Sequence, residues 1–173
     1  MNSTILTHTL RFIGITLFQV LLLKGASPSW ENFNYIQIFL YPVFIMLLPL
    51  RTPNTLVIFL GFVTGLAVDL FYDSVGVHAS ACVFMAFIRP AILALVEPRG
   101  GYNVNHSPTK RRFGIGWFTI YSSCLMFAFL FWYFSVEAFT FYYFWDILLR
   151  TLSSFLVSMV FVVIYQYIFD PKE

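Results

Sequence analysis

Long apolar runs, separated by short polar links, are the feature that most constrains the fold of this chain. Of its 173 residues, 60% are hydrophobic and only 10% are charged, whereas an average soluble domain carries about 25% charged residues. A run of about 20 apolar residues is long enough to cross the hydrocarbon core of a bilayer as a helix. The composition therefore predicts an all-α integral membrane protein, a compact bundle with a single transmembrane domain over residues 1–173.

The apolar runs predict six transmembrane helices, at residues 5–23, 35–50, 54–72, 77–96, 115–135 and 142–169. The second run contains Pro42 and Pro49, which predicts a kink or an early end. The fourth run contains Arg89 and is marginal on its own, since an intramembrane arginine costs about 3 kcal/mol. A cleaved signal peptide is the alternative for the first run, but Lys24 stands where the cleavage site requires a small residue, which favours a membrane anchor.

Lysine and arginine are distributed unequally between the two ends of the predicted helices. With the N-terminus inside, seven of the ten fall on the cytoplasmic side and only Lys24 falls outside, while Arg89 and Arg150 lie within predicted helices and are not counted. The one long polar loop, residues 97–114, belongs to the cytoplasmic side. By the positive-inside rule, this distribution predicts a multi-pass protein with both termini in the cytoplasm.

A stripe of small residues leads to an acid within the third run. Gly61, Gly65 and Asp69 recur every four residues and lie on one face of the predicted helix. Glycines at this spacing permit a neighbouring helix to approach closely, and we expect that approach to carry Asp69 into the protein interior. Gly76, after the helix, is predicted to serve helix packing as well. The alternative is that Asp69 ends the helix near the interface and is hydrated.

Three further polar residues are predicted to lie with Asp69 in the outer half of the bundle. His78 begins the fourth run, while Asp146 and Arg150 stand one helical turn apart in the sixth. Ionisable groups inside a membrane are by default functional-site candidates. We therefore predict a polar cluster with a partner-binding or structural role, in which Arg150 pairs with Asp69. The alternative for Arg150 is that its side chain reaches the outer headgroups.

Arg89 lies apart from this cluster, in the inner half of the fourth run. Its neighbour Pro90 lacks a backbone N–H and frees a carbonyl oxygen in the preceding turn. We expect Arg89 to bind such carbonyls or the phosphates of inner-leaflet membrane lipid, in preference to a substrate.

Signatures of catalysis and of metal binding are not found in the sequence. It has no glycine-rich phosphate loop, no GxSxG, no HExxH and no paired His and Cys arrangement. Cys82 and Cys124 lie inside apolar runs without metal-ligand spacing, and no basic run is long enough to indicate nucleic acid. The expectation is a protein that is not an enzyme, with no cofactor, no metal and no nucleic-acid partner.

The junction of the third and fourth runs, GLAVDLFYDSVGVHASA, resembles the rod shape-determining MreD family of bacteria. The matching positions follow the family's G-L-x-x-D and G-x-H-A patterns, and they are Gly65, Leu66, Asp69, Gly76, His78 and Ala79. The resemblance in topology covers the whole chain, whereas the motif covers about fifteen residues.

This resemblance implies a non-enzymatic scaffold of the cell-elongation machinery in the bacterial inner membrane. Its partners would be a single-span, largely periplasmic MreC-like protein, with MreB, RodA and a transpeptidase in the wider complex. Such a complex directs lateral peptidoglycan synthesis and maintains rod shape. The six-helix fold of the family also looks like that of the S components of energy-coupling-factor transporters. The alternative function is therefore vitamin binding as an S component.

Overall fold

The computed structural model describes residues 2–23, 36–74, 76–102, 107–139, 142 and 144–169. The regular structure within these residues is all helical. The elements in chain order are α1 (Asn2–Phe18), the π-helical turn η1 (Gln19–Leu23), α3 (Val43–Met46), α4 (Asn54–Tyr72), α5 (Val77–Leu95), α6 (Lys110–Phe113), α7 (Ile115–Ala138) and α8 (Phe144–Ile168).

Four of these helices, α4, α5, α7 and α8, are long and apolar enough to cross a membrane. Their bounds agree with the last four predicted runs to within three residues. The first run forms α1 and η1, in which the apolar stretch Thr9–Leu21 is shorter. The prediction of an all-α, membrane-embedded protein agrees with these helices, and among the residues that the structure describes, four helices have the length and composition of a span where six spans were predicted.

The second run, residues 35–50, was expected to be a helix, and this prediction is wrong. Residues 36–40 are not helical, and only the single turn of α3 follows them. Two physical reasons apply. Prolines at 42 and 49 lack the N–H that a helix interior needs, and a helix of this length would extend only about 24 Å, short of the roughly 30 Å hydrocarbon core.

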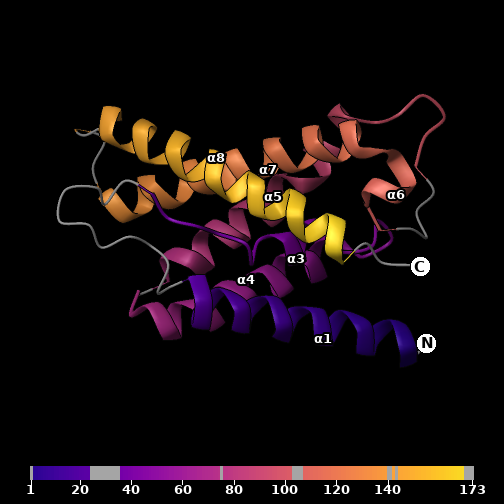
Figure 1. The fold of residues 1–173 in the computed structure, drawn as a ribbon, viewed down its shortest axis with the longest axis horizontal. Helices are drawn as coiled ribbons and strands as arrows, with labels where there is room; N and C mark the ends of the chain where they lie inside the picture. The colour runs from indigo at the N-terminus through magenta and orange to yellow at the C-terminus, as the bar shows by residue number, and fades with distance from the viewer. Residues whose placement is uncertain are drawn as a thin grey trace.

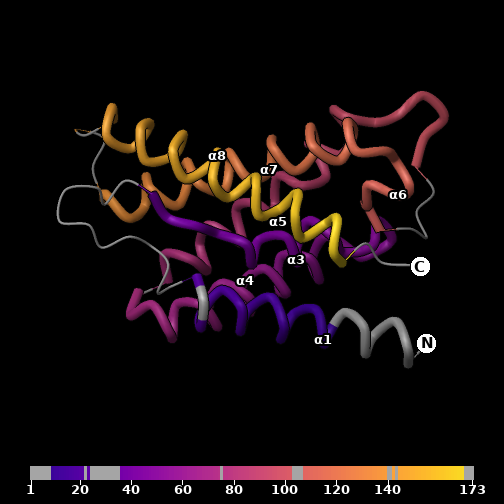
Figure 2. Tube along the Cα trace, in the orientation of Figure 1, coloured from indigo at the N-terminus to yellow at the C-terminus, as the bar shows by residue number. Residues whose placement is uncertain are grey.

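Residues 36–50, which are non-helical except for the single turn of α3, form the core segment of the fold. Every residue from Ile38 to Leu48 is buried. Irregular backbone is tolerated at membrane depth only where protein surrounds it. Figures 1 and 2 show the segment running along the middle of the bundle, with α7 and α8 on one side and α4 and α1 on the other.

The long helices pack in the order α4, α5, α7, α8, each against the next. In Figure 1, α1 begins and α8 ends at the same end of the bundle. At the opposite end, α4 leads into α5 and α7 leads towards α8. Outward faces carry large apolar side chains, as lipid contact requires: Leu70, for example, is 75% exposed, whereas its neighbour Asp69 is 4% exposed.

Candidate functional site

Two glycines of α4, Gly61 and Gly65, permit its close packing against α5. A Cβ at Gly65 would lie 2.4 Å from the Ala79 Cα and 2.5 Å from the His78 carbonyl oxygen. A Cβ at Gly61 would lie 3.1 Å from the Cys82 carbonyl oxygen. These positions face backbone atoms of α5, so the two helix backbones are in direct contact there.

Gly76 has a different role from the one predicted. It precedes α5 with φ of 80°, and a Cβ at this position would meet nothing within 4 Å. Positive φ is a conformation that glycine adopts without steric cost. Gly76 therefore shapes the turn between α4 and α5 and does not serve helix packing.

The Asp69 carboxylate is held by the beginning of α5. Its Oδ1 accepts hydrogen bonds from the Ser74 hydroxyl at 2.6 Å and the His78 amide at 3.1 Å, and its Oδ2 accepts one from the Ala79 amide at 2.9 Å. The residue at the N-cap position of α5 is Gly76, which has no side chain to bind these amides. Asp69 thus caps α5 from the neighbouring helix, and the partial positive charge of a helix N-terminus favours a carboxylate there.

His78 is fully buried beside this cap. Its Nδ1 shares a hydrogen bond of 2.7 Å with the Tyr41 hydroxyl, and its Nε2 has no hydrogen-bond partner. The ring is surrounded by others: its centroid lies 5.0 Å from that of Tyr72 and 4.8 Å from that of Tyr133. One ring nitrogen of His78 is thus hydrogen-bonded, and the other is not.

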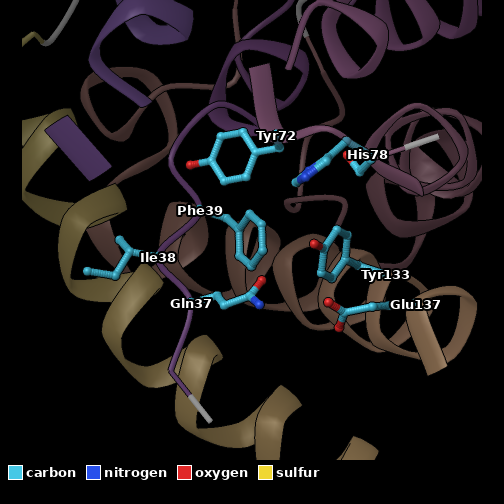
Figure 3. A pocket seen from close by; sticks show the side chains of 8 residues that line it. Gln37, Ile38, Phe39, Tyr72, His78, Tyr133 and Glu137 are labelled. Carbon is cyan, nitrogen blue, oxygen red and sulfur yellow. The ribbon is translucent and has the colours of Figure 1, made fainter. Parts of the chain in front are cut away.

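A cavity of about 330 Å³ opens beside His78, and we name it the junction pocket. Its lining residues come from the core segment, the α4–α5 junction and the end of α7: Gln37, Ile38, Phe39, Tyr72, Ser74, His78, Tyr133 and Glu137. Figure 3 shows Gln37 and Glu137 pointing toward one another from opposite sides, with the rings of Phe39 and Tyr133 nearby. The pocket thus combines aromatic walls with a few convergent polar groups, the usual make-up of a ligand site.

Asp146 and Arg150 lie in a neighbouring cavity, the α7–α8 pocket. It has a volume of about 310 Å³ and is lined by Phe134, Ala138, Asp146, Ile147 and Arg150. The Arg150 guanidinium lies 3.7 Å from the carboxylate of Glu137. Because Glu137 also lines the junction pocket, this ion pair links the two cavities.

The predicted ion pair between Asp69 and Arg150 is wrong. The carboxylate of Asp69 binds one hydroxyl and two backbone amides, all within the α4–α5 junction. Because Gly65 has no side chain, the first turn of α5 packs directly against α4, and the backbone amides of that turn occupy the carboxylate of Asp69. Of the four predicted cluster residues, Asp69 and His78 thus lie together at the junction, whereas Asp146 and Arg150 lie at the next cavity.

Arg89 serves the core segment. It is 3% exposed, and its guanidinium donates hydrogen bonds to the Leu48 carbonyl oxygen and, at 3.0 Å, to the Tyr121 hydroxyl. Tyr121 in turn donates to the Met46 carbonyl oxygen at 3.0 Å. Arg89 therefore binds backbone carbonyls, as one of its two predicted roles requires, but these belong to the core segment and not to the turn before Pro90.

The amides of the core segment are bound by three polar side chains that the sequence reasoning missed. Gln19 accepts from the Leu40 amide and donates to the Ile38 carbonyl oxygen, both at 2.8 Å. Ser154 and Ser158 each accept one amide at 3.0 Å, from residues 37 and 39. The signal in the sequence was that Gln19, Ser154 and Ser158 are polar residues inside long apolar runs. Polar side chains in such runs usually need a buried hydrogen-bond partner.

Among the residues that the structure describes, no group of three or more His, Cys, Asp or Glu side chains is arranged to hold a metal ion. Comparison with known proteins gives no match: no protein-family model, no curated protein and no solved structure matches this chain. The fold and the site define the class as a helical, membrane-embedded protein with a polar pocket at one end of its bundle.

Proposed function

We propose that this protein is a non-enzymatic scaffold of the bacterial cell-elongation machinery, of the MreD type, in the inner membrane. The observation that carries the proposal is that the motif residues act jointly. Gly65 admits the backbone of Ala79, and Asp69 binds the amides of His78 and Ala79. A motif whose members depend on one another in this way is under a common structural constraint, which favours the resemblance over a chance match of small residues.

The proposed topology has six crossings, of which the core segment is the non-helical one. α1 and the core segment would cross in addition to the four spanning helices. Both termini would lie in the cytoplasm together with Lys110, Arg111 and Arg112 of α6. The support is the distribution of lysine and arginine, together with the start of α1 and the end of α8 at one end of the bundle in Figure 1.

In this proposal, the end of the bundle that carries the junction pocket faces outward and meets the partner. An MreC-like protein would bind there, with MreB, RodA and the transpeptidase in the wider complex. Exposed aromatic residues gather at this end, including Phe139, Tyr142 and Trp145. Such residues suit the membrane interface and protein contacts alike.

The alternative function is substrate binding as an S component of an energy-coupling-factor vitamin transporter. One observation favours it specifically: the junction pocket has about 330 Å³ of space, within the range of small-molecule sites. The scaffold remains the preferred function because the motif residues themselves bind one another and do not line the pocket as a set.

Co-purification tests the choice. The chain carries a tag at its C-terminus, is solubilised in a mild detergent, and its partners are identified by mass spectrometry against a tagged, unrelated multi-pass protein. Recovery of a single-span periplasmic coiled-coil protein with elongation enzymes is the expected result. Recovery of two ATPases with a transmembrane coupling subunit would overturn the scaffold and support the S component. Cells depleted of the chain should also lose rod shape and regain it with the wild-type gene.

A further inference from the structure

The end of the bundle opposite the junction pocket carries a group of cations. Because α4 leads into α5 at the pocket end, α4 begins and α5 ends here, next to the start of α7 and the end of α8 (Figure 1). Arg51 precedes α4, Arg99 follows α5, and α6 contributes three more basic residues. Glu97 is the one acid among the described residues that adjoin these helix ends. The described part of this end therefore has a positive net charge.

The short helix α6 is held in place by its neighbours although it has only one turn. Ser107 and Thr109, which precede it, are buried. The Phe113 ring packs against that of Trp117 in α7, with centroids 4.5 Å apart. Trp117 in turn donates a hydrogen bond of 2.6 Å from its Nε1 to the Val96 carbonyl oxygen, at the end of α5. These contacts fix α6 against the ends of α5 and α7.

Lys110 connects α6 to the end of α8. Its Nζ lies 3.5 Å from the centroid of the Tyr167 ring, and the face of an aromatic ring attracts a cation through its quadrupole. The next two residues, Arg111 and Arg112, are exposed. A fixed helical turn thus presents two accessible arginines beside the end of α8.

Exposed apolar side chains lie next to this basic turn. They are Tyr167 and Ile168 at the end of α8 and Ile115 at the start of α7. Cations at the end of a helix beside an apolar outward surface match the two parts of a phospholipid, whose charged headgroup lies at the interface and whose acyl chains lie deeper. A free anion would use only the basic half of this surface, and a soluble acidic protein would leave the apolar half uncovered.

We propose that α6 and the adjacent end of α8 bind an anionic phospholipid. The guanidinium groups of Arg111 and Arg112 donate hydrogen bonds to its phosphate, because the planar donor set of arginine matches phosphate oxygens. Its acyl chains lie along the exposed side chains of α7 and α8. In the proposed topology this end faces the cytoplasm, where the membrane leaflet carries anionic lipid. The basic residues of α6 then form a headgroup site, in addition to orienting the chain.

Native mass spectrometry of the full chain, delipidated in detergent, tests the proposal. Dioleoyl-phosphatidylglycerol, which is anionic, is compared with dioleoyl-phosphatidylethanolamine, which has the same acyl chains and no net charge. We expect phosphatidylglycerol to bind at least about ten-fold more tightly. Arg111→Gln combined with Arg112→Gln should reduce this preference to within about three-fold, since each basic residue near an anionic lipid surface contributes about five-fold.

The matched control is Arg51→Gln combined with Arg99→Gln, which removes the same charge from the same end of the bundle but outside α6. This variant should keep the preference for phosphatidylglycerol within about two-fold of the wild type. An equal loss of preference in both double variants would overturn the proposal, because it indicates attraction by net charge without a site.

Two further outcomes would also overturn it. The first is equal binding of the two lipids by the wild-type chain, which an acidic protein partner in place of the lipid predicts; this comparison decides even if a variant folds poorly. The second is displacement of phosphatidylglycerol by glycerol 3-phosphate at equal concentration, which would show that a free anion binds. Binding in detergent depends neither on the proposed topology nor on the scaffold function, so the failure of each proposal is recognised separately.

Discussion

At the scale of single residues, Asp69 performs the task that usually belongs to the N-cap residue itself. An N-cap side chain binds the amides of the first helical turn and stabilises a helix by about 0.5 to 2 kcal/mol. In α5 that position is Gly76, whose conformation suits the turn and whose missing side chain is replaced by the carboxylate of Asp69. One residue of α4 thereby fixes where α5 begins.

We predict that Asp69→Ala lowers the free energy of unfolding by about 2 to 4 kcal/mol, because two buried amides lose their acceptor. The stability of Asp69→Asn should lie between those of the wild type and Asp69→Ala, since its single amide oxygen can accept only some of the three hydrogen bonds that the carboxylate accepts. Denaturation in mixed micelles measures the change. The matched control is Asp73→Asn, an exposed residue at φ of 53° where asparagine is well tolerated. Equal stability of wild type and Asp69→Ala would contradict the capping role.

Three glycines provide a graded test of helix contact. Gly65→Ala meets backbone atoms of α5 at 2.4 to 2.6 Å, which cannot move aside without separating the helices. We predict a loss of about 3 kcal/mol or more for Gly65→Ala and about 1 kcal/mol for Gly61→Ala, whose nearest contact is 3.1 Å. Gly116→Ala is the control: with nothing within 4 Å, it should be neutral or gain up to about 1 kcal/mol of helix propensity. Thermal unfolding midpoints in detergent measure these changes. A larger decrease for Gly116→Ala or Gly61→Ala than for Gly65→Ala would contradict the prediction.

At the scale of elements, the core segment combines the local backbone hydrogen bonds of residues 40–48 with hydrogen bonds from side chains of the surrounding helices. Its amides and carbonyls bind Gln19 of η1, Arg89 of α5, Tyr121 of α7, and Ser154 and Ser158 of α8. Of the four long helices, α5, α7 and α8 therefore each contribute a polar side chain to the backbone of the core segment, and η1 contributes Gln19. The segment stays irregular because its polar groups are satisfied by these neighbours.

We predict that Ser158→Ala costs about 1 to 2 kcal/mol, because the buried Phe39 amide loses its acceptor. Gln19→Leu should cost more, since it removes two hydrogen bonds to the segment. Hydrogen exchange followed by mass spectrometry should show faster exchange at Phe39 in Ser158→Ala. Ser135→Ala, whose hydroxyl binds only a carbonyl of its own helix, should change stability by no more than about 0.5 kcal/mol. Unchanged exchange at Phe39 would contradict the role of Ser158.

Hydropathy was sufficient to predict the helices and insufficient for the core segment. Residues 54–72 and 77–95 follow directly from apolar length and the intervening turn. A buried irregular segment has the same apolar composition as a helix, and only its prolines and short length distinguish it. The pairing of Asp69 failed for a related reason: sequence gives the depth of a residue along its helix, but the rotation of one helix against another comes from packing. Glu137 was missed because α7 continues one turn beyond its predicted end.

At the scale of the whole molecule, the core segment decides how many times the chain crosses the membrane. If it crosses, the start of α1 and the end of α8 lie on the same side of the membrane, which agrees with their position at one end of the bundle in Figure 1. If it merely dipped into the bundle and returned, α4 and every later helix would be inverted. The excess of lysine and arginine would then lie outside, against the positive-inside rule.

Cysteine labelling in spheroplasts tests this crossing directly. We predict that Gln37→Cys and Tyr142→Cys react with a membrane-impermeant maleimide added outside, because Gln37 lines the junction pocket and Tyr142 stands between α7 and α8, whose ends meet at the same end of the bundle. Thr55→Cys, exposed at the start of α4, should react only after the membrane is permeabilised. The background carries Cys124→Ala, and Cys82 can stay because it is fully buried and should not react. Labelling of Gln37→Cys and Thr55→Cys from the same side would show that the core segment does not cross, whereas labelling from opposite sides requires that a mostly non-helical segment spans the membrane between the surrounding helices.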